Sequence, residues 1–88
     1  MEPDYKLEFT EEALKIMDDR MILKSDVIGV MDELRQTGEA IFDAETGLLI
    51  ARRRIGNVTF WVKYTETEDG GYLIHRAYSH RMNIVLRK

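Results

Sequence analysis

The chain falls into two parts that differ in the spacing of their apolar side chains. From residue 11 to Gly38 apolar side chains recur every three or four positions, which is typical of amphipathic helices. After Gly38 they alternate with polar side chains, and this pattern is typical of strands with one buried face. The sequence therefore predicts a helical N-terminal part followed by a sheet.

Two helices are predicted in the first part. The first covers about residues 11–20, where Thr10 offers an N-cap oxygen and acidic residues occupy the first turn. The second starts at Ser25, which also offers an N-cap oxygen and is followed by an acidic residue. It ends at Gly38, because glycine readily adopts the left-handed conformation that ends helices. Gly29 lies inside the second helix at a cost of about 1 kcal/mol relative to alanine. We therefore expect Gly29 to mark a close contact with the sheet.

Four strands are predicted after Gly38, because turn sequences rich in glycine, asparagine and aspartate interrupt the alternation at regular intervals. Their bounds are about 39–43, 48–55, 58–66 and 72–80. A short alternation from Tyr5 to Phe9 adds at most an edge strand. The predicted fold class is α+β, with two helices packed on one face of a four-stranded antiparallel meander sheet. The N-terminal strand is an optional edge, and residues 1–88 form a single domain.

A two-residue turn at positions 56–57 sets the predicted register of the two central strands. Arg52 then lies beside Trp61, and Arg54 lies beside Thr59 on the same face. The alternate, mostly apolar positions form the core side. The register of the last strand depends on the loop before it. There the apolar pattern favours burial of Ile74 and Tyr78. It sends Leu73, His75, Ser79 and Arg81 to the face that already holds Arg52, Arg54 and Trp61.

Composition narrows the class of protein. With 88 residues the chain has room for one core, and 44% hydrophobic residues suit an ordinary globular domain. It has no cysteine, which excludes disulfides and thiolate metal sites and suits a reducing compartment. Its apolar runs are shorter than the roughly 20 residues of a membrane span. The sequence therefore predicts a cytoplasmic protein with no membrane association.

Charge is distributed unevenly along the chain. Residues 1–47 hold 13 of the 16 acidic and 5 of the 13 basic residues, a net charge of −8, whereas residues 48–88 carry +5. Such asymmetry indicates either a surface for an anionic partner or two halves that neutralise each other at their contact.

The run Arg52-Arg53-Arg54 is the most distinctive local signal, because alternation sends its first and last guanidinium groups to one face together with Trp61. Cations beside an aromatic platform are typical of surfaces that hold RNA or phosphates. The structural alternative is that arginine stems cover the indole, a contact worth roughly 0.5–1 kcal/mol. The predicted residues for binding a partner or RNA are Arg52, Arg54, Trp61, His75 and Arg81.

Several short motifs follow one another along the chain: Thr10-Glu11-Glu12-Ala13, Met17, Arg20, Ile22, Asp26-Val27, Gly38-Glu39-Ala40-Ile41 and Ala77-Tyr78-Ser79. In this spacing the chain resembles small bacterial domains related to RelE-like and BrnT-like toxins. The resemblance implies the α+β layout over nearly the whole chain and RNA-directed chemistry. In that family a His and an Arg precede Ala13 and Met17, and here those positions are Glu12 and Ile16. The resemblance therefore supports the fold more than the activity.

Catalytic and metal chemistry have little support in the sequence. His75 and His80 are the only histidines, and a spacing of five places them on opposite faces of an ideal strand. No metal site and no cofactor are predicted. Tyr78, His80 and Arg81 could serve a metal-independent endoribonuclease, since such groups move protons and hold a phosphate.

Two classes of function follow, with a third possibility beside them. The leading hypothesis is a small non-catalytic accessory or protein-interaction module that binds through the Trp61 and arginine face or through a sheet edge. The alternative is a RelE-like RNA-binding or endoribonuclease domain. Self-association through a sheet edge is the third possibility.

Overall fold

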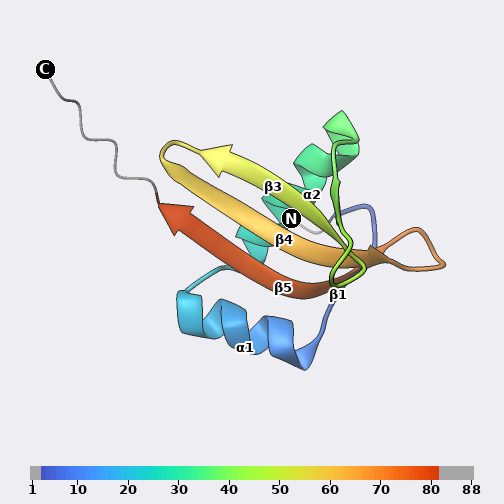
Figure 1. Cartoon of the computed structure of the whole chain (residues 1–88), viewed down its shortest axis with the longest axis horizontal. Coiled ribbons are helices and arrows are strands. Elements are labelled where there is room, and N and C mark those ends of the chain that lie inside the picture. The colour runs from blue at the N-terminus through green and yellow to red at the C-terminus, as the bar shows by residue number, and fades with distance from the viewer. Residues whose placement is uncertain (1–2, 82–88) are drawn as a thin grey trace, which may run out of the picture.

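Figure 1 shows a computed structural model of the chain, which describes residues 3–81 and, for Arg81, the backbone only. The described residues form two helices and five strands. In chain order these are β1 (Leu7–Phe9), α1 (Glu11–Arg20), α2 (Lys24–Thr37), β2 (Ile41–Asp43), β3 (Leu48–Ile55), β4 (Val58–Glu66) and β5 (Tyr72–Arg81).

The first helix begins and ends as predicted. The hydroxyl of Thr10 accepts a hydrogen bond of 3.0 Å from the backbone N–H of Ala13, which satisfies a donor in the first turn. Met21 ends the helix in the left-handed conformation, with a φ of 58°. This residue is 87% exposed.

The second helix begins at a different residue from the one predicted. Leu23 precedes the helix, and its backbone N–H donates to the carboxylate of Asp26 over 2.9 Å. The prediction that Ser25 caps the helix is wrong, because a carboxylate at the third helical position can reach back to the residue before the helix. The helix ends as predicted at Gly38, which has a φ of 70°.

The sheet has five strands in the order β1-β5-β4-β3-β2, and four of them form the predicted antiparallel meander. The α+β class is confirmed. The sheet has five strands rather than four because the N-terminal strand, predicted as an optional edge, joins it as β1. It lies parallel to β5, with Leu7 opposite Tyr72 and Phe9 opposite Ile74. The predicted strand 39–43 is shorter in the structure and begins at Ile41.

Both helices cover one face of the sheet, α1 along β5 and α2 across β3 and β4 (Figure 1). Ala51 and Val62 face each other at the centre of this side, and both are 1% exposed. The buried residues of the helices and strands form one cluster: Ala13, Met17, Ile22, Val27, Val30, Met31, Leu34, Ala51, Val62, Tyr64, Tyr72, Ile74 and Ala77. No helix in residues 3–81 is long and apolar enough to cross a membrane.

A β-bulge changes which residues of β5 face the core. Tyr64 pairs with Ile74 but its neighbour Lys63 pairs with Arg76, so His75 is an extra residue in the strand. Ile74 is buried as predicted. Beyond the bulge every side chain changes face relative to the unbulged strand, and the prediction that Tyr78 is buried is wrong.

Gly29 marks a close contact between α2 and β3, as predicted. A Cβ atom built on this glycine would lie 2.5 Å from Nη1 of Arg53, whose side chain passes beneath the helix. Among the described residues, no carboxylate of α2 forms an ion pair with Arg53. The carboxylate of Asp32, on α2, accepts a hydrogen bond of 2.7 Å from the Tyr5 hydroxyl.

Candidate binding face

The face of the sheet turned away from the helices is basic and aromatic, and we call it the outer face. Strand register places the following residues on it: Arg52 and Arg54 from β3, Thr59, Trp61, Lys63 and Thr65 from β4, and His75, Arg76, Tyr78 and His80 from β5. The inner-facing positions between them belong to the core side. The sequence had predicted Arg52, Arg54, Thr59, Trp61 and His75 as members of this face.

A row of three side chains crosses the middle of the outer face. Arg52 lies opposite Trp61, which lies opposite Tyr78 on the next strand. The guanidinium carbon of Arg52 is 5.6 Å from the centre of the Trp61 ring, a distance at which a cation is attracted to the ring face. The row therefore presents one charge and two aromatic rings side by side.

A second row lies nearer the hairpin turn. Arg54 is opposite Thr59, and Thr59 is opposite His80. Nε of Arg54 donates to the carbonyl oxygen of Gly56 over 3.0 Å, which holds the stem of this exposed side chain beside the turn. Arg54 and Arg52 therefore project from the same side of one strand, as the sequence predicted.

The cations of the outer face differ in how far they are neutralised. Lys63 forms an ion pair of 3.3 Å with Asp43 from β2, and Arg76 forms one of 3.3 Å with Glu12 from α1. Among the residues that the structure describes, Arg52 and Arg54 have no carboxylate within ion-pair distance. The positive charge available to a partner is therefore concentrated on β3.

The pairing of Asp43 is stabilised from several sides. The backbone N–H of Glu45, the hydroxyl of Thr46 and the ammonium group of Lys63 all hold the pKa of the Asp43 carboxyl below its usual range. Asp43 therefore remains charged near neutral pH. It fixes Lys63 within the sheet rather than leaving that cation free for a ligand.

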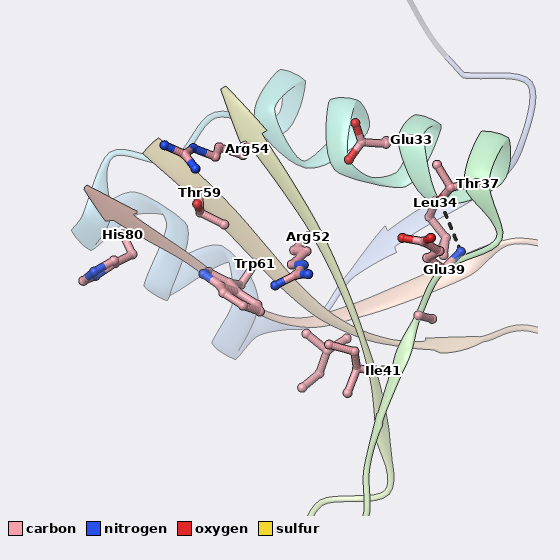
Figure 2. A pocket seen from close by; sticks show the side chains of 12 residues that line it. Glu33, Leu34, Thr37, Glu39, Ile41, Arg52, Arg54, Thr59, Trp61 and His80 are labelled. Atoms are coloured by element: carbon pink, nitrogen blue, oxygen red, sulfur yellow. Dashed lines mark hydrogen bonds between the residues drawn. The ribbon is translucent and has the colours of Figure 1, made fainter. Parts of the chain in front are cut away.

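A hollow of about 590 Å³ lies beside the β3 end of the outer face. Figure 2 shows Arg52, Arg54, Trp61 and His80 on one side of it, and Glu33 and Glu39 on the other. The acidic side chains come from α2 and from the segment that leaves it. The apolar residues Ile41 and Ile50 line its far end.

The hollow runs along an unpaired stretch of strand. β2 pairs with residues 48–50 of β3, and residues 51–55 have a neighbour only on the β4 side within the described part of the chain. Arg52 and Arg54 belong to this stretch. Their side chains and the open backbone edge of β3 consequently border the same space.

The remaining predicted binding residues lie elsewhere. His75 is on the outer face, but its Nε2 hydrogen-bonds the hydroxyl of Thr65 over 3.0 Å, two positions beyond Lys63 and away from the arginines. The backbone of Arg81 pairs with Val58 at the end of β5. The side chain of Arg81 lies outside the described residues.

The bulge also changes the relation between the two histidines. His75 and His80 share the outer face, so the prediction that they lie on opposite faces is wrong. They come from opposite ends of β5. Within residues 3–81 no group of three or more His, Asp or Glu side chains is gathered closely enough to hold a metal ion.

The alternative catalytic residues do not form a chain of proton transfer in the described structure. The Tyr78 hydroxyl accepts a hydrogen bond of 3.4 Å from Nη1 of Arg76, and the guanidinium group of Arg20 lies 5.4 Å from its ring centre. The described residues include no hydrogen-bond partner for the His80 ring. Tyr78 therefore contacts two arginines, Arg20 through its ring and Arg76 through its hydroxyl.

The sequence did not predict Tyr78, His80, Lys63 or Arg76 as members of the outer face, and it did not predict the hollow. Lys63 follows from simple alternation after Trp61. Tyr78 and Arg76 depend on the bulge at His75, for which the sequence carries no glycine or other local signal.

Comparison with family models, with curated proteins and with solved structures finds no match to this chain. The resemblance to RelE-like and BrnT-like toxins therefore stays a prediction. Glu12, which stands where that family has a His, forms the ion pair with Arg76 described above.

Proposed function

We propose that this protein is a small non-catalytic interaction module of the cytoplasm that binds a partner protein through the outer face and the adjoining hollow. One observation carries the proposal. Arg52 and Arg54 are exposed beside Trp61, on a sheet face that the helices leave uncovered, and no described carboxylate neutralises them.

The chemistry of the face suits a protein interface. Tryptophan, tyrosine and arginine are the residues that most often dominate binding energy between proteins, because each offers a large contact area together with a polar group. Trp61, Tyr78 and Arg52 lie in one row on adjacent strands. Strand pairing fixes the backbone at these three positions, so binding a partner requires ordering of side chains only.

The charges around the hollow favour a protein over a uniformly anionic ligand. Glu33 and Glu39 border the hollow that Arg52 and Arg54 also line. A nucleic-acid backbone that entered it would approach two carboxylates as well as two guanidinium groups. A polypeptide carries both polar backbone groups and side chains of either sign, and it can satisfy such a mixed surface.

RNA binding is the second candidate, and the pair Trp61–Tyr78 favours it. Adjacent aromatic rings on a sheet can stack successive bases, and nearby cations can hold the phosphates. Arg52 lies opposite Trp61, and Arg76 lies two positions before Tyr78 on β5. A single strand that lay over this part of the outer face would avoid the acidic wall of the hollow.

Affinity capture with paired variants tests the proposal. The tagged chain is incubated with nuclease-treated lysate, and we expect recovery of a stoichiometric partner protein that Arg52→Ala and Trp61→Ala both reduce. Lys15→Ala is the matched control, because Lys15 is exposed on α1, outside the outer face. The control should retain the partner.

Two results would count against a protein partner. Recovery that is lost on nuclease treatment, together with salt-dependent binding of a single-stranded oligonucleotide, would support the RNA alternative. Equal recovery by all three variants would mean that another surface binds. The mass in solution, measured by light scattering, separates self-association from both.

A further inference from the structure

The open edge of β3 is equipped to receive another strand. Residues 51–55 lack a neighbour on the β2 side in the described structure, and the hollow of about 590 Å³ lies alongside them. A sheet neighbour would lie about 4.8 Å from β3, on the side where Arg52 and Arg54 border the hollow.

The hairpin geometry shows which backbone groups are available at this edge. Ile55 and Val58 flank a two-residue turn, so they exchange both hydrogen bonds with each other. Alternation along the ladder then directs the N–H and C=O groups of Arg53 towards β4. The backbone N–H and C=O groups of Arg52 and Arg54 then point towards the open edge. The backbone groups of Ile50 point the same way, and Ile50 pairs with Ile41 of β2.

The same residues oppose pairing with a second copy. An antiparallel dimer centred on Arg53 would place Arg52 of each copy directly opposite Arg54 of the other. Like charges in directly opposite positions destabilise a sheet. The run of three arginines therefore acts against self-pairing, one of the ways in which natural proteins protect an exposed strand edge.

We propose that the β3 edge binds an extended acidic segment of a partner protein as an added strand, with acidic residues at alternate positions opposite Arg52 and Arg54. This inference rests on the proposed function and names its mode of binding and class of partner. Backbone hydrogen bonds at the edge supply affinity, and the two carboxylate–guanidinium pairs supply register and selectivity.

Charge complementarity sets this occupant apart from others. The chain's own residues 82–88 contain two basic residues and no acidic one, so they do not match the arginines. A nucleic acid provides phosphates but cannot use the backbone groups of Arg52 and Arg54 in a strand ladder. An alternating strand uses both, because alternation directs its acidic side chains to the face of Arg52 and Arg54. Its other side chains point to the opposite face, towards α2, which carries Glu33, so they need not be acidic.

Synthetic peptides test the inference on the full chain. A short labelled peptide that alternates glutamate and valine is titrated with the protein, beside a version with lysine in place of glutamate and a version with a central proline. We expect the glutamate peptide to bind, the lysine peptide to bind at least about tenfold more weakly, and the proline peptide to fail, because proline interrupts strand pairing.

A charge reversal makes the test independent of protein stability. R52E/R54E should lose about tenfold in affinity for the glutamate peptide and gain affinity for the lysine peptide, which an unfolded variant would not do. E11K, on the exposed start of α1, is the matched control and should bind as the unchanged chain does.

The results separate this inference from the proposed function. Equal binding of both peptides, or the same preference in R52E/R54E, would overturn the acidic strand. If the acidic peptide fails while Trp61→Ala still abolishes capture of a partner protein, the strand mode is wrong and the interaction module stands. Binding of a single-stranded oligonucleotide alone would overturn both.

Discussion

Arg52 lies over the indole of Trp61 from the neighbouring strand, with 5.6 Å between the guanidinium carbon and the ring centre. The contact joins the only tryptophan of the chain to an arginine without a carboxylate partner among the described residues. The fluorescence of Trp61 therefore reports directly on the centre of the outer face.

Arg52→Ala should shift the emission of Trp61 and lower the free energy of unfolding by about 0.5–1 kcal/mol, the usual size of an exposed cation–π contact. Arg54→Ala is the control, because Arg54 bonds the carbonyl of Gly56 and is paired with Thr59 rather than with the indole. Fluorescence spectra and urea titrations of both variants provide the measurement. An equal spectral shift in the two would contradict the contact.

Asp26→Ala should destabilise the protein by about 0.5–1 kcal/mol, because the carboxylate accepts the Leu23 N–H and lies in the first turn of α2. Ser25→Ala should change the stability by less than about 0.5 kcal/mol, since Ser25 does not cap the helix. Thermal and urea unfolding of the two variants distinguishes them. A larger loss with Ser25→Ala would restore the cap predicted from the sequence.

Gly71→Ala should destabilise the sheet by about 1–3 kcal/mol. A Cβ atom there would overlap the backbone carbonyl of Lys6, at the point where Lys6 accepts the N–H of Tyr72 over 2.9 Å and β1 approaches β5. Gly29→Ala is the contrasting variant. It meets only the end of the flexible Arg53 side chain, and the gain in helix propensity of about 1 kcal/mol offsets the shift.

Differential scanning calorimetry of the two glycine variants measures the contrast, and hydrogen exchange of Leu7–Phe9 locates it. We expect faster exchange in β1 for Gly71→Ala and unchanged exchange there for Gly29→Ala. Equal losses of stability in the two variants would show that the close contact of β1 with Gly71 does not contribute to the free energy of unfolding.

Tyr64 should titrate at an unusually high pH. Burial raises the pKa of its phenol to about 12 from an ordinary value of 10.0, and the nearby Glu66 and Tyr72 act in the same direction. The group therefore stabilises the fold fully below about pH 10, and this contribution is lost as the pH rises from about 10 to about 12. Phenolate absorbance and unfolding curves against pH test this, with Tyr64→Phe as the control.

Tyr64→Phe should remove one delayed phenolate step and flatten the fall in stability between about pH 10 and 12. The variant keeps the ring that packs edge-on against Tyr72 at a centroid distance of 5.4 Å. An unchanged pH profile in Tyr64→Phe would assign the high-pH transition to other groups.

Much of the fold could be predicted from the sequence because its determinants are local. Thr10 and Gly38 mark helix ends by their own chemistry, and the short turn between β3 and β4 determines that Arg52 meets Trp61. These features predicted half of the outer face, including the two unpaired arginines.

The rest depends on contacts between distant parts of the chain. The bulge at His75 arises where β5 adjusts between its neighbours, and it turns Tyr78 from a predicted core residue into part of the binding face. The parallel pairing of β1 depends on residues 72–74, which follow it by 65 positions. No local pattern near residues 7–9 specifies that partner.

The position of β5 within the sheet has a consequence for synthesis of the protein. This last strand lies between β1 and β4, and α1 rests against it. A nascent chain that has emerged only as far as residue 71 therefore offers neither its first strand nor its first helix a place to dock. The domain can therefore close only after β5 has left the ribosome, and until then β1 and α1 lack the strand against which they pack.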